Sequence, residues 1–181
     1  MIRTERLKLI PLTPDLKFTF QVAPELFGFM LDVKLPEGWP LFPKAFKPRE
    51  HDDSRNWGGF AFVLNKSPLL VGHGGYVSKP DAKANVEIGY EIAPEFRDWG
   101  YATEAAGVLV ERAFINGARS VSVTTLAGAN ASNAVARKLG MRFVDDDFRA
   151  DVGPVWRYRV WTNPQSDVVH KREFARMGEI A

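Results

Sequence analysis

The sequence predicts a mixed α/β domain (α+β) built around one central sheet. Between residues 57 and 93, short apolar or alternating runs are separated by turn residues, which is typical of an antiparallel strand meander. After residue 101 the apolar residues recur at helical spacing, and strand and helix patterns then alternate. The expected order is strand, helices, strand meander, helix, strand, helix and a closing strand pair.

One strand and two short helices are expected at the N-terminal end. Arg6 to Leu12 alternates leucine with polar residues, which predicts a strand that ends at Pro11. Thr13 and Pro14 then supply a cap and a first helical residue. Pro24 is expected to divide the following helical stretch in two.

An aromatic loop and the meander come next. Leu35 to Pro48 carries four of the twelve prolines together with three large aromatic residues. We interpret it either as a lid packed on the core or as one wall of a substrate pocket. The three meander strands are expected at residues 57–64, 69–77 and 85–93.

The C-terminal half is expected to add five elements and a tail. Tyr101 to Asn116 has an apolar stripe of helical period, and Gly117 can end that helix. The other elements are a strand at 120–126, a helix at 131–139, and strands at 141–144 and 155–161. Asp145 to Gly153 between the last two is interpreted as an acidic loop, which is either solvated or faces a cationic acceptor. We expect one domain over residues 1–163, followed by a charged, solvated tail at 164–181.

Composition narrows the class of protein. The 181 residues, of which 45% are apolar and 25% charged, suit a single soluble domain with a sizeable core. A net charge of +2 lacks the basic bias of a nucleic-acid binder, and the absence of cysteine excludes disulfides and thiolate chemistry. No stretch has the composition of a signal peptide or membrane span, so a cytoplasmic location is expected. The three histidines, His51, His73 and His170, are scattered, and no metal site is expected.

The strand at 86–92 and the turn after it carry the chemistry. Val86 to Ile92 alternates strictly, which puts Glu87, Gly89 and Glu91 on one face. The chain then turns through residues 97–102 into a helix, whose free N-terminal amides and partial positive charge favour an anion. Spacing alone fits a phosphate site as well as it fits a tight turn before a core helix.

A second glycine-rich segment, Gly72-His73-Gly74-Gly75, is a weaker candidate for phosphate binding. It lies within a predicted strand, no helix follows it, and the third glycine of a dinucleotide fingerprint is missing. Close strand packing or a bulge explains these glycines better.

The strand and turn resemble the acetyl-CoA-binding motif of the GNAT acetyltransferase superfamily. The matching residues are Val86-Glu87-Ile88-Gly89-Tyr90-Glu91-Ile92, Arg97-x-x-Gly100-x-Ala102 and Thr103-Glu104-Ala105. Three further segments resemble the branch that holds the ribosomal-protein serine and alanine N-acetyltransferases: residues 4–12, 71–76 and 132–141. The resemblance extends from about Ile2 to Trp161. It implies a mostly antiparallel mixed sheet of about seven strands with helices on both faces.

The resemblance also implies how acetyl-CoA binds as a co-substrate. Pantetheine would lie along the strand at Gly89, Tyr90, Glu91 and Ile92. The pyrophosphate would be held at the turn formed by Arg97, Trp99, Gly100, Tyr101, Ala102 and Thr103. The amine would attack the thioester directly in a ternary complex, and a backbone amide near Ile92 would stabilise the oxyanion.

Candidate catalytic residues follow from the same resemblance. The attacking amine must be neutral, which is easier for an α-amine, with a pKa of about 8, than for a lysine at about 10.4. Glu87 and Glu91 are candidates for the base, and we prefer Glu87. Either one is also explained as a solvated or ion-paired strand carboxylate.

The leaving thiolate needs a proton donor. Ala136 stands where many relatives have a donor tyrosine, and Ser132 occupies the position of the suspected donor in the similar branch. Helix capping is the structural alternative for Ser132. That branch has an asparagine where Ala129 stands here, so Asn130 and Asn133 are the candidates to supply its amide to the cofactor.

The function implied is acetylation of a primary amine, with the N-terminal α-amine of a protein such as a ribosomal protein as the first expectation. The first alternative is a GNAT enzyme for a small amine, such as an antibiotic, a polyamine or an amino acid. The second is a catalytically weak, CoA-binding regulatory module. No nucleic-acid or membrane partner is expected, and the sequence leaves monomer and homodimer open.

Overall fold

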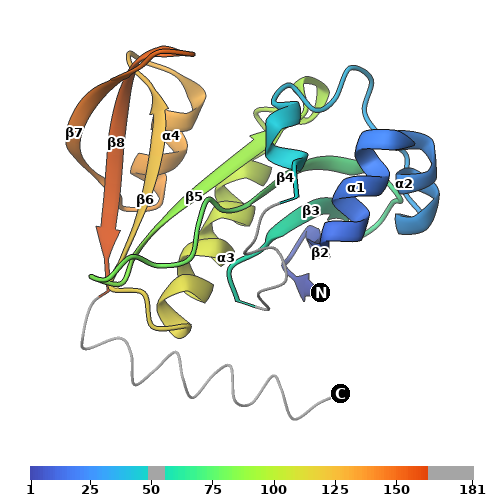
Figure 1. The fold of residues 1–181 in the computed structure, drawn as a ribbon, viewed down its shortest axis with the longest axis horizontal. Helices are drawn as coiled ribbons and strands as arrows, with labels where there is room; N and C mark the ends of the chain where they lie inside the picture. The colour runs from blue at the N-terminus through green and yellow to red at the C-terminus, as the bar shows by residue number, and fades with distance from the viewer. Residues whose placement is uncertain (49–55, 163–181) are drawn as a thin grey trace.

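A computed structural model describes residues 1–48 and 56–162, which form one eight-stranded sheet flanked by helices (Figure 1). The predicted tail at 164–181 and the histidines at 51 and 170 lie outside the described residues. The strands are β1 (Ile2–Arg3), β2 (Leu7–Leu12), β3 (Gly59–Leu64), β4 (Leu70–Tyr76), β5 (Asn85–Ile92), β6 (Ser120–Leu126), β7 (Arg142–Arg149) and β8 (Gly153–Trp161). The helices are α1 (Pro14–Val22), α2 (Pro24–Leu31), α3 (Tyr101–Ile115) and α4 (Ala131–Lys138), with short 3₁₀ turns η1 (Pro43–Phe46) and η2 (Pro94–Phe96).

The sheet has the strand order β1-β2-β3-β4-β5-β6-β8-β7. Strands β5 and β6 are parallel, and the other neighbouring pairs are antiparallel. The predicted mixed, mostly antiparallel sheet is therefore confirmed. It has eight strands against the expected seven or so, because the two-residue β1 pairs with β2 at the sheet edge.

Two hydrophobic cores lie on opposite faces of the sheet. On one face, α3 and α4 bury Leu109 and Ala136 against strand residues such as Phe62 and Ile88. On the other face, α1, α2 and η1 cover a smaller core rich in aromatic rings. Helices thus flank both faces, as expected from the sequence.

Local sequence signals explain where the first helices begin and end. The Thr13 hydroxyl accepts the Leu16 amide at 3.2 Å, and Pro14 occupies the first turn of α1. Pro24 opens α2 because proline lacks the amide that a continuous helix would need there. Asp32 ends α2 in the left-handed region at φ 52°. The two-helix prediction is confirmed.

Two expectations about strand ends were wrong. Pro11 does not end β2 but lies within it, opposite Phe60 of β3. Strand β1 reaches only Lys8 and Leu9, so among the described strands β2 has a single neighbour at this point. The acidic residues after Val144 do not form an irregular loop but continue β7 as far as Arg149. Most side chains of β7 are exposed, and charged residues are common on such an edge strand. Asp145 also pairs with Arg157 of β8 at 3.0 Å.

Strands β5 and β6 are paired over three residues and then diverge. The parallel ladder joins Asn85, Val86 and Glu87 to residues 120–122, and the described contacts include no pairing of Ile88 to Ile92 with β6. Figure 1 shows the two strands meeting at one end and spreading apart toward the other. The sheet therefore opens beside the second half of β5. In the described part of the chain, no helix is long and apolar enough to span a membrane.

Candidate active site

The candidate site begins at the open side of β5. Residues Ile88 to Ile92 pair with β4 on one side, in a register that sets Gly89 opposite Gly75. Their other side faces the divergence from β6, where the described strands form no ladder with them, and this leaves room for an extended ligand. The residues predicted to lie along pantetheine, Gly89 to Ile92, all fall in this unpaired half.

The predicted pyrophosphate turn leads directly into α3. Gly100 is the residue before the helix and has φ +82°, a left-handed conformation that glycine adopts without strain. The first helical hydrogen bond runs from the Glu104 amide to the Gly100 carbonyl, so the amides of residues 101–103 precede the helical ladder. The turn and α3 have the geometry of an anion site at a helix N-terminus.

Arg97 links the predicted pyrophosphate turn to the strand that precedes it. Its Nε donates to the Ile92 carbonyl at 3.2 Å, which ties the turn back to the end of β5. The rest of the side chain is exposed, so a guanidinium remains near the turn.

A second arginine, which the sequence analysis did not assign to the site, holds the same turn. Arg6 donates from Nη1 to the Trp99 carbonyl at 2.7 Å and from Nε to Glu104 at 2.7 Å. Its guanidinium lies 4.8 Å from the centre of the Tyr101 ring and against Gly100. The only sequence signal was the position of Arg6 in the N-terminal segment of the resemblance.

Glu104, in the first turn of α3, binds Arg6 and Thr4, and we call these three residues the clamp. Its carboxylate accepts the Thr4 hydroxyl at 2.5 Å and the Arg6 amide at 2.8 Å, in addition to the Arg6 side chain. Partial burial would raise the pKa of Glu104, but hydrogen bonds from Thr4 and Arg6 outweigh it, so the pKa lies below its ordinary value. The segment before β2 is thereby fixed to the predicted pyrophosphate turn.

The two candidate bases have different surroundings. Glu91 is buried, and its carboxylate accepts the amides of Leu41 and Phe42 at 2.7 and 3.0 Å. Burial raises the pKa of Glu91, against the opposing effect of these amides. Its hydrogen bonds hold the aromatic loop, so its side chain has a structural task.

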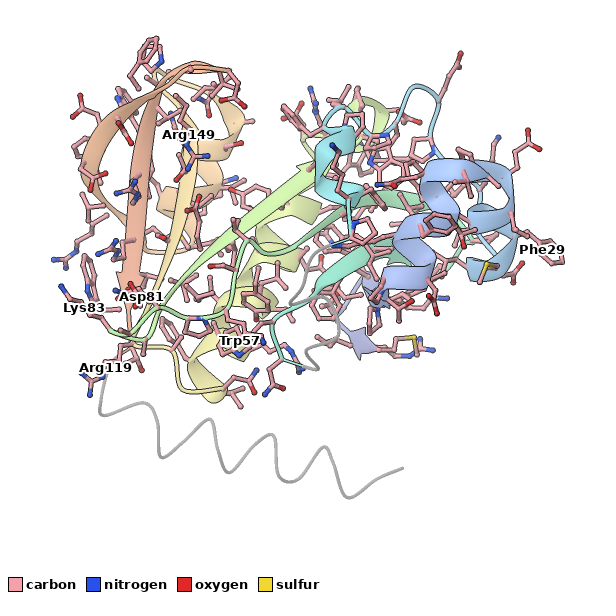
Figure 2. The ribbon with its side chains drawn as sticks, in the orientation of Figure 1. Phe29, Trp57, Asp81, Lys83, Arg119 and Arg149 are labelled. Carbon is pink, nitrogen blue, oxygen red and sulfur yellow. The ribbon has the colours of Figure 1, made fainter. Side chains whose placement is uncertain are left out.

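Glu87 lies at the end of the paired part of β5 and lines an adjoining cleft of about 350 Å³. Its Oε1 is 3.6 Å from a guanidinium nitrogen of Arg149, and its side chain is 27% exposed. This carboxylate is thus reachable from the cleft. Figure 2 labels Arg149 on the β7–β8 side of the sheet, and both it and Thr124 line the same cleft.

The turn between β6 and α4 places the other predicted residues. Asn130 is the cap of α4, and its Oδ1 accepts the Asn133 amide at 3.0 Å. Ser132 is the second helical residue, so the helix-capping interpretation of Ser132 was wrong. The Tyr90 hydroxyl donates to the Ser132 backbone carbonyl at 3.4 Å, so this phenol contacts the first turn of α4.

The side-chain amides of the two asparagines have partners within this turn. Asn130 Nδ2 donates to the carbonyls of Leu126 and Gly128. Asn133 is fully buried, and its side chain binds Thr125 and the Gly128 carbonyl. Both residues shape the β6–α4 turn, and the Asn130 side-chain amide already donates to two carbonyls.

The aromatic loop packs on the core, as one of its two sequence interpretations expected, and it also borders the cleft. Trp39 and Phe46 are buried in the second core, whereas Phe42 is exposed and lines the cleft. His73 lies beneath, with its ring centre 5.5 Å from that of Trp39 and 4.8 Å from that of Phe46. Within residues 1–48 and 56–162, no three His, Asp or Glu side chains gather as a metal site would need.

Comparison with known proteins identifies the family. Residues 6–142 match the acetyltransferase (GNAT) domain, so the chain belongs to the GNAT acetyltransferase family. It is an N-acetyltransferase, and GNAT acetyltransferases use acetyl-CoA. A search of curated proteins found no match for the chain.

Solved structures share the fold at low identity. An acetyltransferase from Agrobacterium tumefaciens is 24% identical with a TM-score of 0.61, over 89% of this chain and 94% of that one. RimL, a ribosomal α-N-protein acetyltransferase in complex with coenzyme A, is 15% identical with a TM-score of 0.59, over 87% and 95%. A variant of the Vibrio cholerae spermidine N-acetyltransferase is 15% identical with a TM-score of 0.61, over 90% and 96%.

Proposed function

We propose that this enzyme transfers the acetyl group of acetyl-CoA to the N-terminal α-amine of a protein, such as a ribosomal protein. The observation that carries the proposal is the divergence of β5 from β6, which starts at Glu87 and runs toward the α3 turn. A thioester bound along β5 would then end beside the cleft that Glu87 lines. RimL, which shares this fold, is an enzyme with an acceptor of this class.

The residues present fit acetyl-CoA. The first amides of α3 and the cation of Arg97 suit a diphosphate, and the unpaired half of β5 suits the amides of pantetheine. Acetyl-CoA supplies an activated acetyl carbon. The other steps fall to the chain: it orients the amine, removes its proton, stabilises the oxyanion and returns a proton to the sulfur.

Glu87 is proposed as the base. The amine nitrogen bonds to the acetyl carbon as the carbon–sulfur bond breaks, and the amine proton passes to Glu87 directly or through water. An α-amine with a pKa of about 8 needs little help to be neutral, which suits a carboxylate base. A backbone amide in the unpaired half of β5, beside the thioester carbonyl, would stabilise the oxyanion. The Ile92 amide expected from the sequence lies at the diphosphate end of that half, about 16 Å along the strand from Glu87.

Ser132 is proposed as the donor to the leaving thiolate, with Tyr90 as a second candidate. Burial raises the pKa of Tyr90, so its hydroxyl keeps its proton through the neutral range. The two residues meet where the Tyr90 hydroxyl reaches the first turn of α4. Either hydroxyl would restore coenzyme A as the neutral thiol.

The experiment is a thiol-release assay with acetyl-CoA and a panel of amines. Peptides beginning with Ser or Ala are compared with spermidine, an aminoglycoside and free amino acids. The proposal predicts that the peptides have the highest kcat/KM and that mass spectrometry places the acetyl group on the α-nitrogen. Preferential turnover of a small amine would replace the proposal by the first alternative, which the fold shared with a spermidine N-acetyltransferase favours.

A protein that binds coenzyme A but acetylates none of these amines would support the regulatory alternative. The cytoplasmic location expected from the sequence and the choice between monomer and homodimer stay predictions. Size-exclusion chromatography with light scattering decides the second.

A further inference from the structure

Three glycines form a row across the floor of the cleft. The strand registers set Gly59 of β3 opposite Gly75 of β4, and Gly75 opposite Gly89 of β5. All three line the cleft, on the face of β5 that also carries Glu87. The row therefore begins one side-chain position from the proposed base and leads away from it, across the sheet, to α1 and β2.

Packing requires only the middle glycine of this row. A Cβ at Gly75 would lie 2.5 Å from the Gly59 Cα, so the close approach of β3 and β4 excludes a side chain there. A Cβ at Gly59 would find its nearest neighbours at 3.8 Å, and one at Gly89 would find Val77 at 3.9 Å. Neither of these outer residues has a positive φ. The fold can accept alanine at both, so their lack of a side chain leaves space for something other than the protein.

A buried polar atom beside the row needs a partner. His73 precedes Gly75 by two residues on the same face of β4, lines the cleft and is 6% exposed. Its Nδ1 has no hydrogen-bond partner among the described residues. Contacts with Trp39 and Phe46 hold the ring in place, and burial, aided by Lys17, lowers the pKa of His73 to about 3. A buried neutral imidazole nitrogen without a partner is unusual, and a polar group of a ligand would satisfy it.

The dimensions of the floor indicate the acceptor. Two strand spacings, from β5 to β3, amount to about 10 Å. An extended peptide advances about 3.3 Å per residue, so about three residues cover the row. A free amino acid with its amine at Glu87 would reach Gly89 but not Gly59.

We infer that the acceptor is the unblocked N-terminus of an extended peptide, which crosses the Gly89–Gly75–Gly59 row with its α-amine at Glu87 and a backbone group hydrogen-bonded to His73. This inference rests on the proposed function and adds to it the class of acceptor and the path that it takes. The acceptor is recognised over about three residues, and side chains at the outer glycines would exclude it.

The test uses steady-state kinetics with a ladder of C-terminally amidated peptides of one to six residues that share the same first residue. For the wild type, kcat/KM should rise at least tenfold from one residue to about three and then level off. Gly59→Ala should raise the KM of the longer peptides at least tenfold and leave that of the one-residue amide unchanged. Gly89→Ala should impair every member of the ladder.

Two controls separate acceptor binding from other effects. The KM of acetyl-CoA and the melting temperature of Gly59→Ala should stay close to the wild-type values. His73→Phe keeps an aromatic ring between Trp39 and Phe46 but removes the nitrogen, and it should raise the peptide KM without a matching change in kcat.

The possible failures are distinct. Peptide turnover that is independent of length, or long peptides unaffected by Gly59→Ala, would overturn the inference while the proposed function stands. Turnover of small amines without turnover of any peptide would overturn the proposed function and the inference together.

Discussion

Arg6 offers a sharp test of how the predicted pyrophosphate turn is held in place. Arg6→Met keeps an unbranched side chain of similar length but removes the donors to Trp99 and Glu104 and the cation over Tyr101. Arg6→Lys keeps the charge but loses the planar fork that reaches two acceptors at once. Arg3, an exposed arginine on β1, gives the matched control Arg3→Met.

The magnitude follows from the geometry of the clamp. The Arg6 side chain is 41% exposed in its pair with Glu104, and an exposed pair contributes about 0.2 to 1 kcal/mol. The bond to the Trp99 carbonyl adds about 1 kcal/mol. If the turn loses its order in the variant and coenzyme A must restore it on binding, about 1 to 2 kcal/mol of binding free energy is lost. The Kd of coenzyme A then rises about 5- to 30-fold.

Isothermal titration of coenzyme A into each variant measures this effect. Arg6→Met and Arg6→Lys should both bind coenzyme A more weakly, whereas Arg3→Met should match the wild type. Wild-type affinity in Arg6→Met would refute the role of the clamp. Wild-type affinity in Arg6→Lys with loss in Arg6→Met would show that charge, and not the position of the turn, is what matters.

Three further predictions concern catalysis and pH. Ser132→Ala should lower kcat about tenfold or more without changing the affinity for acetyl-CoA, and Tyr90→Phe should match the wild type if Ser132 is the donor. Calorimetry measures the affinity and single-turnover kinetics measure the chemical step. Unchanged turnover in Ser132→Ala would show that Ser132 is not the acid. Glu87→Gln should lower kcat about 10²- to 10⁴-fold at neutral pH. Part of the rate should return as the pH rises, because the free amine becomes more abundant. A flat pH profile of this variant would contradict the role of Glu87 as base. Burial lowers the pKa of His73 from 6.5 to about 3, so the folded protein keeps this histidine neutral. Below pH 6.5 the unfolded chain binds a proton at His73 that the folded protein does not. The contribution of His73 to the free energy of unfolding is therefore lost as the pH falls from 6.5 toward 3. The expected slope is about 1.4 kcal/mol per pH unit, and urea unfolding at pH 7 and pH 5 should show a smaller loss for His73→Phe than for the wild type.

Local sequence signals were sufficient for most of the fold. The Thr13 cap, the break at Pro24 and the glycine after α3 each act within a few residues, and the structure has helix ends at all three places. The strand pattern at 120–126 matches β6 residue for residue. Signals of this kind need no knowledge of distant contacts.

The errors arose where distant neighbours decide the structure. Composition indicated a loop after Val144, but the residues there pair with β8, and Arg157 offsets the charge of Asp145. Pro11 is tolerated inside β2 because β1 stops short of it. Neither neighbour is visible from the local pattern.

The residues of the candidate site fall into the same two groups, those with local sequence signals and those brought together by distant contacts. The turn and the strand from Glu87 to Ile92 could be proposed as a cofactor site because they are continuous in the sequence. Arg6 reaches its partners 93 and 98 residues away, and the Arg149 contact with Glu87 likewise joins separate strands. The cleft-facing glycine row was missed because its members come from three strands, although the His73 segment had drawn attention for its glycines.

A crystal structure with coenzyme A bound is the decisive measurement. We expect the diphosphate on the backbone amides of the turn from Trp99 to Thr103, pantetheine along Gly89 to Ile92 in the divergence between β5 and β6, and the thiol close to Glu87 and Ser132. A coenzyme A molecule bound away from the α3 turn, or with its thiol outside the cleft, would contradict this expectation.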